Sequence, residues 1–325
     1  MVCGVIDIGA NSIRLSIYSV EENAARLLLN KKETAGLASY VKNRKLSQKG
    51  VDKACAVLND FKNILTNLNI TSYYAFATAS LRNIANTEEA ILYIRAHTDI
   101  RVDVLSGEEE AMLGFAGAVR ESGIQNGMMI DVGGGSTEVV GFRGVEVTAA
   151  SSMPVGSLNL FTKHVKKLLP SEIELRNISI DIIEQLVMLH GYGIAPIRKI
   201  IGIGGTVRAA AKLGNEYFGY PEDCTMMRTE EIGQILKHYR DRDGKVMKTI
   251  LLVAPERVHT LIPGLDIMFN VAQYFGAETI IANKYSIREG YVNKRIIGGD
   301  SNNAASKTAG DEIYTEPGTV MAEIQ

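Results

Sequence analysis

The sequence predicts an α/β protein in which one folding plan occurs twice. A turn at residues 131–138 reads Asp-Val-Gly-Gly-Gly-Ser-Thr-Glu, and residues 7–15 carry a related version, Asp-Ile-Gly-Ala-Asn-Ser-Ile-Arg-Leu. When Asp7 is aligned with Asp131, the first glycine and the serine of each turn also coincide. Each copy is an apolar strand that ends in an acid, followed by a small-residue turn and a second apolar run. The repeat predicts two related domains that face each other across a cleft.

The first copy is expected to run β-β-β-α-β-α-β-α. Its clearest helix covers residues 49–68, because apolar residues recur there at every third or fourth position. The expected strands are 5–8, 14–20, 26–32, 73–77 and 102–105, and the expected helices are 49–68, 88–97 and one that begins after Gly107.

The same rhythm restarts near residue 126 with another three-strand meander. We therefore predict one domain over residues 1–125 and a second over 126–298, with a polar, aperiodic and disordered tail over 299–325. In the second copy the expected strands are 127–131, 136–142, 145–151, 199–203 and 279–282, and the expected helices are 157–169, 180–189, 207–213, 230–239, 263–275 and 286–295.

Bulk composition excludes several classes of protein. The 325 residues are 46% hydrophobic and 22% charged, as in ordinary soluble globular proteins. A net charge of −2 gives no general attraction to nucleic acid or to an anionic membrane, so neither is an expected partner, and a polyanion would need a local basic cluster. Three scattered cysteines, no signal-peptide pattern and no apolar run of spanning length favour a cytoplasmic protein without disulfides.

The second turn has the composition of a phosphate-binding loop. Gly133, Gly134 and Gly135 leave the backbone free of side chains, so consecutive N–H groups can converge on one phosphate. Ser136 and Thr137 add hydroxyl donors. The alternative is a glycine-rich hairpin in which the aspartate only forms the turn, and the repeat makes this alternative the weaker one.

The first turn is expected to act from the opposite side. Asn11 and Ser12 take the phosphate-binding places there, and Asp7 and Asp131 stand at strand ends, where a carboxylate can hold Mg²⁺ through its waters. Mg²⁺ is therefore the expected cofactor, with Mn²⁺ as the alternative.

Six motifs taken together are similar to those of the exopolyphosphatase/guanosine pentaphosphate phosphohydrolase (Ppx/GppA) family, in a short two-domain form. The resemblance covers residues 1–297 and implies a duplicated actin-like ATPase (ribonuclease H-like) fold. Besides the two turns, the motifs are Ala-Thr-Ala-Ser-Leu-Arg-Asn at 77–83, Ser-Gly-Glu-Glu-Glu-Ala at 106–111, Gly-Gly-Thr at 204–206 and Ser-Ile-Arg-Glu-Gly at 286–290.

The resemblance implies hydrolysis of a terminal phosphoanhydride with Mg²⁺. Glu109, the middle of three glutamates, would be the general base that deprotonates the attacking water. Glu138 would be an acid facing the metal, and Arg82 would hold a phosphate by its planar fork. Two alternatives stay open: Ser106 and Glu109 have the spacing of a helix capping box, and Arg82 could be a solvated surface residue.

Residues 204–206 come directly after an expected strand and begin a helix, so Gly205 and Thr206 are available to an anion. They would bind the distal phosphate or only close the strand onto the helix. None of the five histidines has metal-ligand spacing to another. His259 stands in Pro-Glu-Arg-Val-His, where the family more often has Ala-Asp after Glu-Arg.

The sequence thus predicts release of orthophosphate from the end of inorganic polyphosphate or from guanosine pentaphosphate (pppGpp). Longer relatives carry a C-terminal helical domain, so short polyphosphates are the expected substrates, and Lys163, Lys166 and Lys167 could line an approach. A homodimer is left open. The alternatives are an actin-like ATP-binding module (a kinase or a nucleotide-gated interaction protein) and a catalytically inactive sensor.

Overall fold

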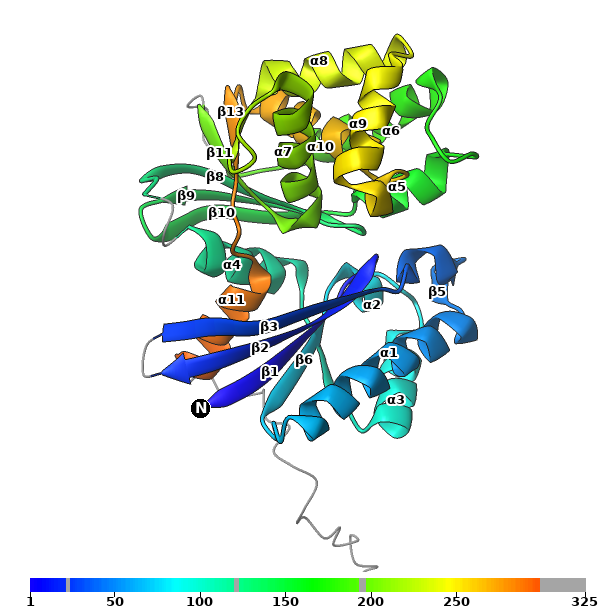
Figure 1. Cartoon of the computed structure of the whole chain (residues 1–325), viewed down its shortest axis with the longest axis vertical. Helices are drawn as coiled ribbons and strands as arrows, with labels where there is room; N and C mark the ends of the chain where they lie inside the picture. The colour runs from blue at the N-terminus through cyan, green and yellow to red at the C-terminus, as the bar shows by residue number, and fades with distance from the viewer. Residues whose placement is uncertain (22–23, 120–122, 193–196, 299–325) are drawn as a thin grey trace, which may run out of the picture.

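A computed structural model describes residues 1–21, 24–119, 123–192 and 197–298. Two β-sheets lie in two halves of the molecule, and helices α4 (Gly107–Ala118) and α11 (Ile287–Tyr291) lie between them (Figure 1). The tail predicted at 299–325 is outside the described residues. Among the described helices, none is long and apolar enough to cross a membrane.

The two sheets have the same topology. Each begins with three antiparallel strands and continues with two strands parallel to the first, and the second sheet adds an edge strand antiparallel to its neighbour. The first sheet has the order β3-β2-β1-β6-β7, from β1 (Val2–Ile8), β2 (Ser12–Glu21), β3 (Ala24–Thr34), β6 (Tyr73–Ala77) and β7 (Val102–Val104). The second has the order β10-β9-β8-β11-β13-β12, from β8 (Asn126–Val132), β9 (Thr137–Arg143), β10 (Glu146–Met153), β11 (Lys199–Ile203), β12 (Met226–Arg228) and β13 (Thr279–Ala282).

The register of the sheets matches the repeat residue by residue. Asp7 of β1 pairs with Arg14 of β2, and Asp131 of β8 pairs with Glu138 of β9. The predicted α/β class and the duplicated, actin-like plan are therefore confirmed. Two further short strands, β4 (Val41–Lys42) and β5 (Lys45–Leu46), form a hairpin outside this plan.

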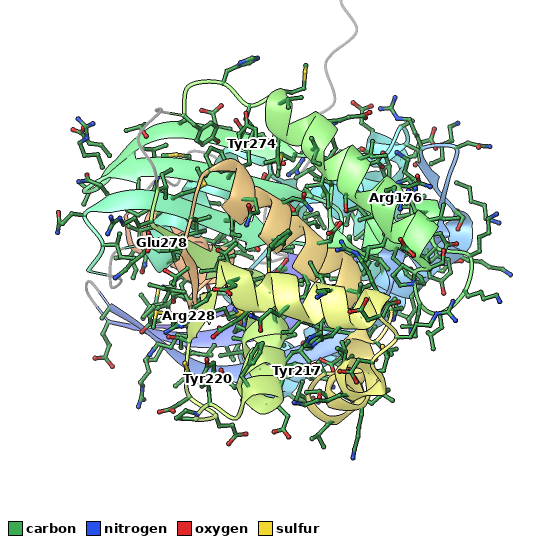
Figure 2. All side chains as sticks on the ribbon, turned by 90° about the horizontal axis from the view of Figure 1, so that it is seen from above. Arg176, Tyr217, Tyr220, Arg228, Tyr274 and Glu278 are labelled. Carbon is green, nitrogen blue, oxygen red and sulfur yellow. The ribbon has the colours of Figure 1, made fainter. Side chains whose placement is uncertain are left out.

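Helices cover the outer face of each sheet and form the two largest cores (Figure 1). The first sheet is covered by α1 (Gln48–Asn67) and α3 (Thr87–Thr98), with the short α2 (Ala79–Arg82) after β6. The second is covered by α5 (Ser157–His164), α6 (Glu172–Val187), α7 (Gly204–Phe218), α8 (Thr229–Arg240), α9 (Gly244–Val253) and α10 (Leu261–Tyr274). Seen from above, α6, α8, α9 and α10 cover the second half (Figure 2).

The inner faces are covered by an exchange of helices. Helix α4 follows the first sheet but packs Phe115 and Ala118 against β8, β9 and β11 of the second. Helix α11 follows the second sheet but packs Ile287 and Tyr291 against β1, β2 and β6 of the first. The π-helix after α11 (Val292–Ile297) continues this contact. Each half therefore supplies part of the other's core, while the division at residue 125 stays a prediction.

Three helices differ from the sequence prediction. Helix α6 begins at Glu172, eight residues earlier than expected, because Ser171 and Glu174 form a capping box. Helix α5 ends at His164, since Val165 is already extended. Helix α9 was not predicted, and the N–H of Lys245 is capped there by Asp243.

Candidate active site

A cleft of about 130 Å³ lies between the two halves, where the duplicated turns meet. The first sheet contributes its turn, Gly9–Ser12, and the second contributes Gly133–Ser136. In both copies the glycine N–H donates to the serine carbonyl oxygen, over 3.1 Å from Gly9 to Ser12 and 3.0 Å from Gly133 to Ser136. The two turns are thus alike in conformation as well as in sequence.

Helix α5 fixes the orientation of the second turn. The N–H groups of Ser157 and Leu158 donate to the carbonyl oxygens of Gly133 and Gly134 at 2.9 and 3.0 Å. The side-chain amide of Asn159 donates to the carbonyl oxygen of Gly135 at 2.7 Å. Because the C=O and N–H of one peptide unit point in opposite directions, three consecutive N–H groups, those of residues 134–136, are directed away from α5 and are available to an anion.

The side chains of the turn are divided between the cleft and the protein interior. Ser136 lines the cleft, but Thr137 is fully buried and its hydroxyl donates to the carbonyl oxygen of Val155. Asn11 and Ser12 both line the cleft. The structure thus brings together the predicted phosphate-binding residues of both turns, except Thr137.

Three carboxylates line the cleft: Asp7, Asp131 and Glu110. Burial and, after it, the nearby Glu138 raise the pKa of Asp131 to about 7. Burial also raises the pKa of Asp7, opposed by Arg288 and Arg14. Burial and the charge of Glu138 hold the pKa of Glu110 well above its ordinary value. Such acids mark a functional site, because their environment favours either a proton or a cation.

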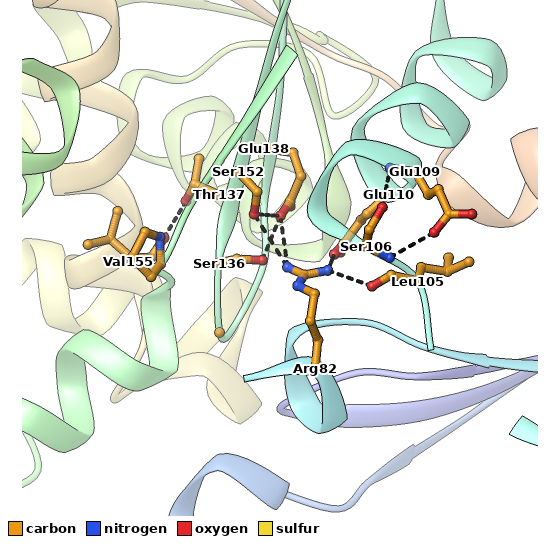
Figure 3. A network of polar contacts seen from close by, with 12 residues as sticks. Arg82, Leu105, Ser106, Glu109, Glu110, Ser136, Thr137, Glu138, Ser152 and Val155 are labelled. Atoms are coloured by element: carbon orange, nitrogen blue, oxygen red, sulfur yellow. Dashed lines mark hydrogen bonds and ion pairs between the residues drawn. The ribbon is translucent and has the colours of Figure 1, made fainter. Parts of the chain in front are cut away.

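Arg82 joins the two halves beside the cleft. Its Nη1 donates to Glu110 Oε2 at 2.6 Å and to the carbonyl oxygen of Leu105 at 3.1 Å (Figure 3). Its Nη2 donates to Ser152 at 3.3 Å and lies 3.6 Å from Glu138 Oε1. Arg82 is therefore largely buried between carboxylates, and it is not a solvated surface residue.

Glu138 lies behind the cleft and is almost completely buried. Its Oε1 accepts hydrogen bonds from Ser136 and Ser152, both at 2.7 Å (Figure 3). Its Oε2 is buried and has no hydrogen-bond partner among the described residues. The residue predicted to face a metal thus contacts the phosphate turn through Ser136.

Glu109 points away from the cleft, in a different direction from Glu110 on the same helix (Figure 3). Its carboxylate accepts the N–H of Ser106 and the guanidinium of Arg295, both at 2.9 Å. The capping box with Ser106 is complete, as one of the two sequence interpretations expected. Glu109 does not line the cleft, whereas its neighbour Glu110 does.

Four arginines also line the cleft: Arg14, Arg208, Arg257 and Arg288. Burial and the neighbouring Arg288 lower the pKa of Arg14 to about 10. Burial likewise lowers the pKa of Arg208 and Arg257. Like charges packed this closely repel one another unless an anion lies among them. This is the local basic cluster that a polyanion would require on a protein of net charge −2.

The Gly-Gly-Thr motif closes the cleft from the second half. Gly204 has a positive φ of 91° and lies against the Asp131 carboxylate. Gly205 lies against the Arg257 guanidinium, which donates to Thr206 Oγ1 at 3.5 Å. The motif starts α7 and also lines the cleft. Its position is therefore compatible with both sequence interpretations, binding of the distal phosphate and closure of the strand onto the helix.

Sequence reasoning missed Arg208, Arg257, Arg288 and Ser157. A signal existed, since Arg257 precedes the noted His259 and Arg288 is part of the noted motif at 286–290. His259 itself packs edge-on against Phe161 and does not line the cleft. None of Lys163, Lys166 and Lys167 lines it, and Lys163 is paired with Asp181 at 2.6 Å.

Most of the chain, including the second turn, matches a known family. The family model described as "Ppx/GppA phosphatase family" matches residues 16–296. The chain belongs to the Ppx/GppA phosphatase family. The family resemblance inferred from the motifs is thereby confirmed.

Curated relatives match this chain over part of their own length. Exopolyphosphatase 1 of Mycobacterium tuberculosis is 29% identical over 158 residues, which cover 47% of this chain and 46% of the relative. A bifunctional 3-dehydroquinate synthase/phosphatase of Fusobacterium nucleatum is 26% identical over 313 residues, 89% of this chain and 46% of the relative. The chain thus spans about half the length of the curated relatives it matches.

Solved structures of Ppx/GppA proteins share the fold. An exopolyphosphatase from Cytophaga hutchinsonii superposes with a TM-score of 0.80 at 22% identity, covering 92% of this chain and 98% of that one. The Ppx/GppA protein of Aquifex aeolicus superposes with a TM-score of 0.72 at 23% identity, covering 92% of this chain and 99% of that one. At these identities the likeness establishes the fold alone.

The raised pKa of Asp131 predicts a pH-dependent stability. The folded protein binds the carboxyl proton of Asp131 more tightly than the unfolded chain does. Protonation of Asp131 therefore stabilises the folded state fully below the ordinary pKa of 3.8, and this stabilisation is lost as the pH rises through about 7. We expect the melting temperature to fall over this range, and to fall less in Asp131→Asn. Thermal unfolding of both proteins between pH 4 and 8 checks this, and equal slopes would contradict it.

Proposed function

We propose that this protein is a Mg²⁺-dependent phosphatase that releases orthophosphate from the end of a phosphoanhydride chain. The observation that carries the proposal is the geometry of the cleft, where two matched turns face each other and the buried carboxylate of Glu110 lines the same space. Backbone N–H groups, arginines and carboxylates are the groups that phosphoryl transfer requires for charge stabilisation and water activation.

The proposed substrate is inorganic polyphosphate, with pppGpp as the second candidate. A single phosphate needs the donors of one turn, whereas four arginines around one small cleft suit several linked phosphates. The name exopolyphosphatase carried by relatives points the same way. Phosphates beyond the terminal one would contact Arg14, Arg257 and Arg288, while the terminal one lies between the turns.

The proposed general base is Glu110, in place of the Glu109 expected from the motif. Glu110 is only 8% exposed and lines the cleft, whereas Glu109 is used in the helix cap. Burial raises the pKa of Glu110, which makes its ionised carboxylate a stronger proton acceptor than that of an ordinary glutamate. The water oxygen would attack the terminal phosphorus, the bond from phosphorus to the bridging oxygen would break, and Glu110 would take the water proton.

Asp7 and Asp131 are the residues proposed to hold Mg²⁺. Among the described residues there is no group of three or more His, Cys, Asp or Glu side chains that could hold a metal ion. Two carboxylates fit Mg²⁺ nonetheless, because this ion keeps several waters and takes further oxygens from substrate phosphates. A bound Mg²⁺ would neutralise charge on the phosphoryl oxygens and would favour the ionised form of Asp131, whose pKa is raised by burial and then by Glu138.

Arg82 and Glu138 are proposed to position the site. Arg82 fixes the Glu110 carboxylate by a hydrogen bond of 2.6 Å, and its planar fork could donate to a phosphate oxygen. Glu138 orients the Ser136 hydroxyl and holds Arg82 from the second half. We therefore assign Glu138 a positioning role behind the cleft, where sequence alone suggested a metal ligand.

The proposal predicts which substrates are hydrolysed. Purified protein with Mg²⁺ is expected to release orthophosphate from short-chain polyphosphate, from pppGpp or from both, and only weakly from ATP. Phosphate release measured separately on the three compounds checks this. Hydrolysis of ATP alone would support the ATP-binding alternative and would refute the proposal.

A further inference from the structure

Two of the cleft arginines share one hydrogen-bond acceptor. Arg14 Nη1 donates to Asn30 Oδ1 at 3.1 Å, and Arg288 Nη1 donates to the same oxygen at 3.4 Å. Arg14 comes from β2 of the first sheet, and Arg288 comes from α11, which enters from the second half. Asn30 itself lies on edge strand β3 and does not line the cleft.

The strand register explains how Asn30 reaches both arginines. Asn30 pairs with Ser16 across β2 and β3, and Arg14 lies two residues from Ser16, on the same face of the sheet. Ser16 is buried and its hydroxyl accepts from Arg288 Nη1 at 2.7 Å. Ser16 and Asn30 therefore form a small polar platform under Arg288, with Arg14 beside it.

Within the described parts of the chain, Asn30 is the only side chain that accepts a hydrogen bond from Arg14. Arg288 has other partners, Ser16 and Ser286, and its Nε lies 3.9 Å from Asp7 Oδ2. Loss of Asn30 would thus free Arg14 more than Arg288. The amide orientation is chemically determined, because an NH₂ group in this place would face two donors.

The neutrality of the amide is the important property. Two adjacent guanidinium groups repel each other, and after burial the charge of Arg288 is the next cause that lowers the pKa of Arg14. A carboxylate would hold them more strongly but would cancel positive charge that an anionic substrate needs. An amide oxygen fixes both groups and leaves both charges available.

We propose that Asn30 is a positioning residue that holds Arg14 and Arg288 together, without adding a negative charge of its own, for the part of a polyanionic substrate beyond the phosphoryl group removed. This rests on the function proposed above for the same cleft. Asn30 does not touch the reacting atoms, so its effect falls on substrate binding. It sets how strongly the cleft discriminates in favour of highly charged chains.

Two substitutions separate charge from simple packing. Asn30→Asp keeps the shape and both acceptor contacts but neutralises one positive charge, whereas Asn30→Leu removes the contacts and leaves the charges. With tripolyphosphate as substrate we expect KM to rise about tenfold in Asn30→Asp and about threefold in Asn30→Leu, with kcat little changed in both. The matched control is Asn63→Asp, the same chemical change at an exposed position of α1.

A second measurement needs no substrate. Without ligand, Asn30→Asp relieves the repulsion between the arginines, so its melting temperature is expected to rise by about 1–3 °C at low salt. High salt should reduce this gain. Asn30→Leu and Asn63→Asp should show no such rise.

The outcomes are distinct. If the wild type releases no phosphate but Asn30→Asp alone is stabilised without ligand, the proposed function fails and the role of Asn30 as a neutral bridge stands. If KM rises as much in Asn30→Leu as in Asn30→Asp, or more, the proposed role of Asn30 as a neutral bridge is refuted, because loss of packing alone would explain that result. An Asn30→Asp variant that melts like the wild type would refute it as well.

Discussion

Glu110→Gln is expected to lower the turnover of polyphosphate by about 10²-fold or more, the usual scale for loss of a general base. The amide keeps an oxygen that can accept from Arg82, so the position of the side chain is preserved while its basicity is lost. KM should change little, because the turns and the arginines that bind phosphate are untouched. Steady-state phosphate release with Mg²⁺ provides both constants.

The adjacent Glu109→Gln is the matched control. Its carboxylate caps α4 and pairs with Arg295, so its loss should cost about 1 kcal/mol of stability with turnover nearly unchanged. If Glu109→Gln loses turnover and Glu110→Gln retains it, the assignment of the base returns to the middle glutamate of the motif.

Gly290→Ala is expected to destabilise the protein by about 3 kcal/mol or more, or to prevent folding. Helices α4 and α11 cross with their backbones in contact, and a methyl group at Gly290 would overlap the carbonyl oxygen of Leu113. Neither partner can move away easily, since both are helix backbone. Because α4 carries Glu110 and α11 carries Arg288, the change would also displace the two sides of the cleft.

Gly244→Ala is the control for this prediction. Nothing lies within 4 Å of the methyl group that it would add at the start of α9, so we expect a neutral effect or a gain of about 0.4–1 kcal/mol. Thermal or denaturant unfolding of the two variants checks both expectations. A Gly290→Ala protein that unfolds like Gly244→Ala would show that the helix crossing can relax.

Local pattern was sufficient for the plan of the fold and for the prediction that the two turns meet at one cleft. The acid, glycine and serine of each turn repeat in sequence, so Asp7, Asp131 and the turn between Gly133 and Ser136 could be matched without coordinates. The exchange of α4 and α11 between the halves was not predictable. It depends on which sheet each helix packs against, and periodicity reports only that a helix has an apolar face.

The choice between Glu109 and Glu110 also required the structure. Consecutive residues on a helix differ by about 100° in direction, so one glutamate can cap the helix while the next faces the cleft. The motif contains both and does not distinguish them. Three of the arginines were missed for a related reason, since Arg208, Arg257 and Arg288 are widely separated in sequence and only folding brings them together.

The central claim is that the two matched turns hold one terminal phosphate beside Glu110. A crystal structure of Glu110→Gln with tripolyphosphate and Mg²⁺ tests it most directly. We predict a terminal phosphate bound by the N–H groups of residues 134–136 and facing the Asn11–Ser12 turn, with the remaining phosphates directed toward Arg14 and Arg288. A polyphosphate bound elsewhere, with both turns free of phosphate, would contradict the account.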